Sequence, residues 1–330
     1  MVSCELCGLN LMRTQNGPLR VQLMAAIEVE DLHKLYGDFE AVRGISFRVA
    51  EGEVFALLGP NGAGKSTTLE ILEGHLRRTA GRVSVLGADP EGGGRALRER
   101  IGIVLQSAGI DTELSVREVL SMYASFYPAP LPVRDAIEIV GLDEKARTRI
   151  GALSGGQRRR LDLALALIGN PDLIFLDEPT TGFDPAARRS AWQLVQNLRS
   201  LGRTILLTSH YMDEVQQLAD RTAVIAAGRI VATGSPASLT DSKRVTTEIL
   251  FRLPEPVTLE QIPAGLRDLV TPVDGRLGIC TTEPTAMLSR LCGWASGAGV
   301  ELQALEVLRP SLEDVYLELT QAQQADDVPA

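Results

Sequence analysis

The stretch GPNGAGKST at residues 59–67 decides the fold of this chain of 330 residues. It follows an apolar run at residues 54–58 that is typical of a buried strand, and a helix is expected to begin near Ser66. Glycines between a strand and a helix let the backbone aim successive N–H groups at phosphate oxygens. The pattern is the P-loop, and it predicts nucleotide binding by Gly59, Pro60, Asn61, Gly62, Ala63, Gly64, Lys65, Ser66 and Thr67.

Polar side chains in and beyond the P-loop predict the chemistry of the site. Lys65 is expected to lie between the β- and γ-phosphates, and the Ser66 hydroxyl to bind Mg²⁺. A second apolar run ends in Asp177 and Glu178, and a sheet interior would not hold this carboxylate pair without counter-charges. They are therefore expected at the mouth of the sheet, where Asp177 reaches Mg²⁺ through water and Glu178 polarises the attacking water.

The pentapeptide LSGGQ at residues 153–157 is a second candidate for anion binding. It precedes a run whose apolar residues recur at helical spacing, so it places a serine hydroxyl and glycine N–H groups at a helix N-terminus. A simple cap of that helix by Ser154 is the alternative interpretation.

With these motifs in this order, residues 25–238 resemble the nucleotide-binding subunit of ATP-binding-cassette (ABC) transporters. The resemblance implies an α/β P-loop NTPase fold, with a mixed-sheet core and a helical subdomain, and ATP and Mg²⁺ as cofactors. It also implies a head-to-tail dimer, formed by two copies or by paired cassettes. In that dimer, four signature residues cover the γ-phosphate held by the other chain: Ser154, Gly155, Gly156 and Gln157.

The remaining site residues come from the same resemblance. Gln106 matches the Q-loop, which touches Mg²⁺ and the attacking water, and Asp184 matches the D-loop. His210 matches the switch histidine near the γ-phosphate. Tyr36 lies where the family stacks an aromatic ring on adenine, and Val42 is predicted to pack against the same base. The resemblance thus assigns Glu178, His210 and Gln106 to catalysis.

Composition limits the partners of the chain. A net charge of −9 and a pI near 5.1 argue against nucleic acid as the main partner. No apolar stretch approaches the length needed to cross a bilayer, so transport would require a separate transmembrane permease. The expected location is the cytoplasmic face of the cell membrane. The four cysteines are interpreted as reduced thiols, because no second CxxC completes a zinc site.

The chain is expected to divide into four parts: a disordered leader (1–24), the ATPase cassette (25–238), a small α+β accessory domain (244–322) and a tail (323–330). The polar stretch at 235–242 is predicted to be a linker. In the accessory domain, strands are predicted at 245–253, 276–281 and 300–308, and helices at 259–266 and 286–294.

Two further features bear on partners and on the branch of the family. Met122, Tyr123, Phe126 and Tyr127 crowd together where the family forms a groove for the coupling helix of the membrane subunit, and ordinary core packing explains them equally well. Residues 310–319 resemble the closing helix of daunorubicin-resistance-type (ABC-2 exporter) ATP-binding proteins, with a generic capped helix as the alternative.

The sequence therefore predicts an ATP-hydrolysing subunit of an exporter for a drug, lipid or polysaccharide. A soluble regulatory or assembly ABC ATPase is the main alternative, and only a membrane partner separates the two. A module that senses ATP with negligible turnover is a third possibility, which Glu178 and His210 disfavour.

Overall fold

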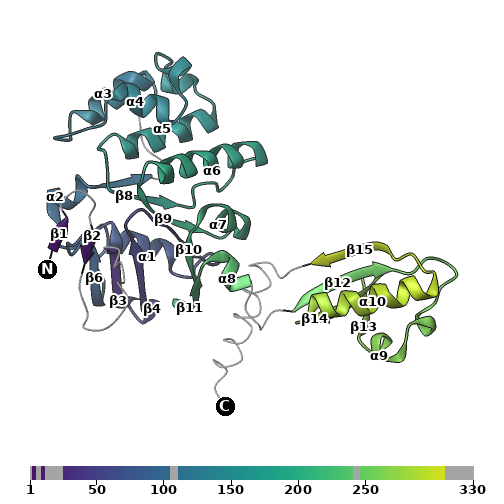
Figure 1. Cartoon of the computed structure of the whole chain (residues 1–330). Coiled ribbons are helices and arrows are strands. Elements are labelled where there is room, and N and C mark those ends of the chain that lie inside the picture. The colour runs from purple at the N-terminus through teal and green to yellow at the C-terminus, as the bar shows by residue number, and fades with distance from the viewer. Residues whose placement is uncertain (1, 5–8, 12–24, 105–110, 241–245, 309–330) are drawn as a thin grey trace. The chain divides into compact units, whose positions relative to one another are not determined.

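The computed structural model describes residues 2–4, 9–11, 25–104, 111–240 and 246–308 (Figure 1). The chain divides into two compact units, Met1–Ser235 and Pro236–Ala330.

A six-stranded sheet runs through the first unit in the order β11-β10-β5-β9-β8-β7. Its neighbours are parallel except for the edge pair β10–β11. The inner strands β5 and β9 are buried along their whole length, as expected for a sheet covered on both faces. The strands are β5 (Val54–Leu58), β7 (Ile101–Val104), β8 (Leu173–Asp177), β9 (Thr204–Ser209), β10 (Arg221–Ala226) and β11 (Arg229–Gly234).

A second, antiparallel sheet has the order β4-β3-β6, with β3 at Ala25–Tyr36, β4 at Phe39–Ala50 and β6 at Ala80–Val85. Its apolar residues join those of β5 and of α1 (Lys65–Leu72) in one core. Phe47 and Phe55 stack across the two sheets, with ring centroids 5.5 Å apart. The predicted mixed-sheet core is thereby confirmed.

Helices complete the first unit. The predicted helical subdomain is confirmed: it consists of α3 (Val116–Ala124), α4 (Val133–Ile139) and α5 (Gly155–Leu167), which pack against one another, together with the short turns η1 (Asp143–Lys145) and η2 (Ile150–Ala152). The other helices are α2 (Gly94–Arg98), α6 (Pro185–Ser200) and α7 (Met212–Leu218), of which α6 and α7 lie beside each other next to the sheet (Figure 1).

The second unit is an α+β domain with its own core. Its antiparallel sheet has the order β13-β14-β12-β15. Ile249, Phe251 and Ile279 of the sheet pack with Leu291 of α10 and with Ile262. The elements are β12 (Thr247–Arg252), β13 (Val270–Val273), β14 (Arg276–Thr281), α10 (Pro284–Ala298) and β15 (Gln303–Leu308).

The structure adds detail to the predicted division of the chain. Within residues 1–24, the two short strands β1 (Val2–Cys4) and β2 (Leu9–Leu11) pair antiparallel. The segment predicted to be a linker contains a short helix, α8 (Pro236–Thr240).

Within the second unit, the single helix expected at 259–266 is two pieces, η3 (Leu259–Gln261) and α9 (Ala264–Arg267). Pro263 separates them because proline holds the preceding residue in an extended conformation. Strand β13 was not predicted, because Pro272 weakens its pattern. The predicted closing helix at 310–319 lies outside the described residues.

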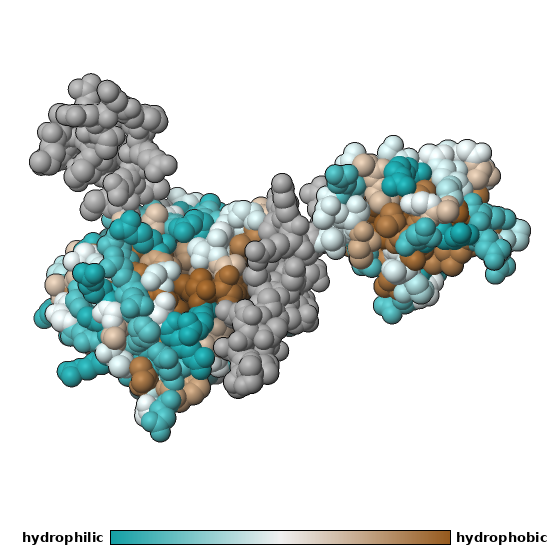
Figure 2. All heavy atoms as spheres, turned by 90° about the horizontal axis from the view of Figure 1, so that it is seen from below, coloured by the Kyte–Doolittle hydropathy of each residue, from teal (hydrophilic) through white to brown (hydrophobic). Residues whose placement is uncertain are grey.

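Among the described residues, no helix has the length and apolar character that a membrane span requires. Figure 2 shows polar residues over much of the visible face of each unit, with apolar residues gathered in smaller patches.

Candidate functional site

The P-loop joins β5 to α1 and presses closely against neighbouring backbone. A Cβ atom on Gly59 would lie 2.2 Å from the carbonyl oxygen of Ile225, and one on Gly64 would lie 2.6 Å from that of Ala41. Gly64 also has a φ of 100°, which side chains rarely permit. Gly59 and Gly64 therefore belong to the loop for steric reasons.

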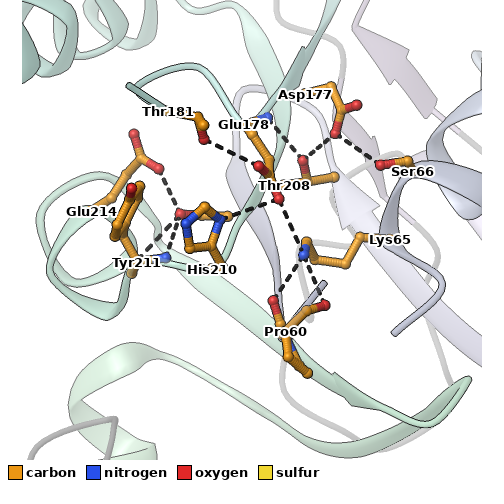
Figure 3. Close-up of polar contacts among 12 residues, drawn as sticks. Pro60, Lys65, Ser66, Asp177, Glu178, Thr181, Thr208, His210, Tyr211 and Glu214 are labelled. Carbon is orange, nitrogen blue, oxygen red and sulfur yellow. Dashed lines mark hydrogen bonds and ion pairs between the residues drawn. The ribbon is translucent and has the colours of Figure 1, made fainter. Parts of the chain in front are cut away.

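Lys65 begins α1 and lies almost completely inside the loop, with 4% of its surface exposed. Its Nζ donates hydrogen bonds to the carbonyl oxygens of Gly59 at 2.8 Å and Pro60 at 3.1 Å. The same atom lies 3.3 Å from Oε1 of Glu178 (Figure 3). The structure thus brings the P-loop lysine to the carboxylate that follows β8.

Asp177 ends β8 and is held by two hydroxyl groups. Its Oδ1 accepts a hydrogen bond from Thr208 Oγ1 at 2.5 Å, and Ser66 Oγ lies 3.4 Å away (Figure 3). A hydroxyl beside a carboxylate is the hard-oxygen donor set that Mg²⁺ takes alongside phosphate oxygens. Ser66 and Asp177 therefore fit the predicted cation.

Thr208 is a site residue that the sequence reasoning missed. Its hydroxyl donates to Asp177 and also accepts the backbone N–H of Glu178 at 3.0 Å. The available signal was a threonine that follows the apolar run at residues 205–207 near the end of the strand. Its contact with Asp177 depends on the pairing of β9 with β8, which places the two residues side by side.

Glu178 has an uncommon backbone conformation, with φ at 44°. Thr181 Oγ1 donates to its Oε2 at 3.1 Å, and His210 Nδ1 lies 3.2 Å from its Oε1. This second contact is close but poorly aligned, because Nδ1 of His210 makes no hydrogen bond of good geometry to the described residues.

The charge state of Glu178 follows from its neighbours. Burial would raise the pKa of this carboxyl, but His210 and Lys65 outweigh burial and hold the pKa below its usual value. Glu178 is therefore an anion at neutral pH and accepts hydrogen bonds, as a group that orients water must.

The LSGGQ stretch forms the N-terminus of α5. Ser154 is the N-cap: its hydroxyl accepts the N–H of Gln157 at 3.3 Å, and the Gln157 side chain accepts the N–H of Ser154 at 3.0 Å. The capping interpretation therefore describes the local geometry correctly. Ser154, Gly155 and Gly156 are also exposed, so this helix end is open to a second molecule.

The other predicted residues are placed as follows. Asp184 is the N-cap of α6, and its Oδ1 accepts the N–H groups of Ala186 and Ala187. Tyr36 is 47% exposed at the end of β3, so its ring is available to a base. Gln106 lies outside the described residues.

Val42 needs a correction. It is only 1% exposed and belongs to the core, so it offers almost no surface to a nucleotide base. Its Cγ2 lies close to Gly64, so the Val42 side chain packs against the P-loop on the core side.

Comparison with known proteins identifies the family. Residues 42–181 match the ABC transporter family. The Nod factor export ATP-binding protein I of Burkholderia lata is 38% identical over 311 residues, which cover 92% of this chain and 99% of that protein. The chain belongs to the ABC transporter family. The protein of the same name from Rhizobium etli is 38% identical over 303 residues, covering 90% of this ABC ATPase and 94% of the relative.

Further comparisons concern its parts. Residues 247–311 of the ABC ATPase match the C-terminal domain of ABC transporter domain-containing protein-like sequences. The structure of cbiO1 from Clostridium perfringens, part of the transporter complex cbiONQ, has a TM-score of 0.60 and 32% identity, covering 66% of this chain and 92% of that one. The structure of another ABC transporter cassette in its ADP conformation has a TM-score of 0.57 and 29% identity. The match covers 64% of this chain and 91% of that one.

These matches confirm three predictions: the cassette fold, ATP hydrolysis, and membership among the ATPase subunits of exporters. The alternative of a regulatory ATPase without a transport role finds no support among them.

Proposed function

We propose that this ABC ATPase works at the cytoplasmic face of the membrane and drives a separate permease that exports a drug, lipid or polysaccharide. The relatives are named for the export of Nod factor, so Nod factor is a candidate substrate. One observation carries the proposal: Lys65, Glu178 and His210 follow the adjacent strands β5, β8 and β9 and lie in contact at one edge of the sheet.

Each group has a role that its position supports. The P-loop N–H groups and Lys65 would hold the ATP phosphates, and Ser66 and Asp177 would hold Mg²⁺, which would neutralise phosphate charge. Glu178 accepts a hydrogen bond from the attacking water and so orients it. His210, beside Glu178, faces the γ-phosphate. The Q-loop role of Gln106 stays a prediction, because Gln106 lies outside the described residues.

The site is completed by a second cassette, which is another copy of this chain or a paired subunit. Its signature residues are Ser154, Gly155 and Gly156, which are exposed, and Gln157, which is partly exposed. They bring a hydroxyl and a helix N-terminus to the γ-phosphate. Its D-loop residue Asp184 approaches the same nucleotide. Tyr36 stacks on the adenine ring.

Docking of the permease is assigned to a hollow of about 240 Å³ beside β7 and the helical subdomain. Tyr123 and Tyr127 line this hollow, and Met122 and Phe126 nearby are 44% and 62% exposed. This exposure favours a groove over ordinary core packing for Met122 and Phe126. Tyr127 packs closely on Gly169.

Two substitutions test the catalytic assignment. Glu178→Gln keeps the shape of the side chain but removes the carboxylate, so ATP binding should persist while turnover falls about 100-fold or more. Lys65→Ala should weaken ATP binding itself. Glu51→Gln, at an exposed turn, is the matched control. Near-normal turnover in Glu178→Gln would place the catalytic carboxylate elsewhere. Purification from native membranes should recover the permease with the chain.

A further inference from the structure

Arg188, on α6, contacts the residue that packs against the switch histidine. Its guanidinium carbon lies 4.4 Å from the centroid of the Tyr211 ring, and its Nη1 donates to Asp213 at 3.2 Å. The Tyr211 ring in turn lies 4.0 Å from the imidazole of His210, tilted by 40°. Arg188, Tyr211 and His210 thus form a continuous chain of contacts that ends at Glu178.

The guanidinium is held in a position that does not satisfy all its donors. The Arg188 side chain is 24% exposed, and its buried Nε has no hydrogen-bond partner among the described residues. A buried donor without a partner is costly, so the ring of Tyr211 and the carboxylate of Asp213 must compensate. The cation is therefore fixed against the ring and is not a mobile surface charge.

This contact connects two parts of the site that are distant in sequence. Arg188 lies one turn after Asp184, and its N–H donates to the Asp184 carbonyl oxygen at 2.9 Å. Tyr211 is the N-cap residue just before α7, and its N–H donates to Ser209 Oγ at 2.9 Å, at the end of β9. The start of α6 is thereby linked to the segment that carries His210.

We propose that Arg188 is a positioning residue for ATP hydrolysis, holding His210 in its orientation toward Glu178 through the ring of Tyr211. Because Arg188 lies one helical turn after the D-loop residue Asp184, a displacement of that loop would be passed to His210. The proposal rests on the role proposed above for His210.

The kinetic test uses Arg188→Met, which keeps the aliphatic stem and removes the charge. Arg189→Met, at the exposed neighbouring arginine, is the matched control. The kcat of Arg188→Met should fall about 3- to 30-fold, the range that a partly buried cation–π contact supplies, with KM for ATP changed less than about twofold. Tyr211→Leu should show a similar loss, whereas Tyr211→Phe keeps the ring and should retain most of the activity.

A second readout does not depend on turnover. The chain contains three histidines, so the ring protons of His210 can be followed by NMR without nucleotide. Their resonances should move in Tyr211→Leu and in Arg188→Met, and stay in place in Arg189→Met. If Arg188→Met fails to fold, the Tyr211→Leu and Tyr211→Phe pair provides the same test.

An unmoved His210 resonance in Arg188→Met, or a kcat within about twofold of Arg189→Met, would overturn the proposal. Full turnover in His210→Ala would locate the error in the role assigned to His210. Loss of turnover in His210→Ala with full turnover in Arg188→Met would reject the role proposed for Arg188 and retain the role proposed for His210.

Discussion

Single residues at the site are held in conformations that the free chain would avoid. Glu178 adopts a left-handed φ of 44°, and its N–H and carboxylate are fixed by Thr208 and Thr181. Backbone strain of this kind persists only where the surroundings determine it. Here the strained backbone orients the carboxylate of Glu178, and Lys65 and His210 keep that carboxylate ionised.

Glu73, at the end of α1, gives a prediction about pH. Burial, followed by the charges of Asp177 and Glu70, raises its pKa to about 8. The folded state therefore binds a proton more tightly than the unfolded state, so this group's contribution to stability is full below pH 4.5 and is lost as pH rises through 8.

Glu73→Gln is neutral at every pH, so it should abolish this pH-dependent change in stability, which amounts to about 5 kcal/mol when the whole shift is expressed. Urea unfolding at pH 5.5, 7 and 8.5 should show stability falling with pH more steeply in the wild-type chain than in the variant. Glu51→Gln should keep the wild-type slope. Equal slopes in Glu73→Gln and the wild-type chain would contradict the assignment.

Two helices begin with the same local device in different surroundings. Ser115 caps α3 in a capping box with Glu118, and Ser154 caps α5 in a capping box with Gln157. Both serines accept a helix N–H group, so they have the same kind of role in local structure. Only Ser154 belongs to the LSGGQ stretch. Comparing the same substitution at Ser115 and Ser154 therefore distinguishes a role in helix capping from a role in nucleotide binding.

Ser115→Ala and Ser154→Ala should each lower stability by about 1 kcal/mol, the usual value of a serine cap. Ser154→Ala should also lower ATP turnover about tenfold, because it removes the hydroxyl that we propose faces the partner's phosphate. Ser115→Ala should leave turnover unchanged. Equal turnover in the two variants would mean that Ser154 is only a cap. Thermal unfolding and steady-state ATPase assays decide between these outcomes.

At the scale of the whole molecule, the chain consists of two units with separate cores. The core of the first surrounds β3, β4 and β5, and that of the second joins β12, β14 and α10. The site residues that the structure describes all belong to Met1–Ser235. Nucleotide binding should therefore not require the second unit.

A chain ending at Ser235 should fold and bind ATP with an affinity within about threefold of the full chain, because the division between the units crosses neither core. Circular dichroism and nucleotide titration test this. Insolubility of the shortened chain, with the full chain soluble, would show that the second unit stabilises the first.

A mixing experiment tests whether each ATP site is shared between two chains. Lys65→Ala spoils the P-loop of a chain, and Ser154→Arg spoils the signature that it offers to its partner. Each variant alone should be nearly inactive, whereas a mixed dimer contains one intact site and should recover part of the activity. Recovery should rise with protein concentration, as dimer formation requires. Full activity of Ser154→Arg by itself would contradict a shared site.

The sequence alone predicted that the side chains of Lys65, Asp177, Glu178 and His210 lie close together, from the positions of these residues after the predicted strands. Each follows an apolar run, and the carboxyl ends of parallel strands share one edge of the sheet. Contacts between separate elements were not predictable in this way. Thr208 holds the carboxylate pair through the register of β9 with β8, and Val42 lies in the core instead of against a base. The Arg188–Tyr211 contact and the raised pKa of Glu73 likewise depend on packing and burial, which arise only when distant segments meet and exclude water.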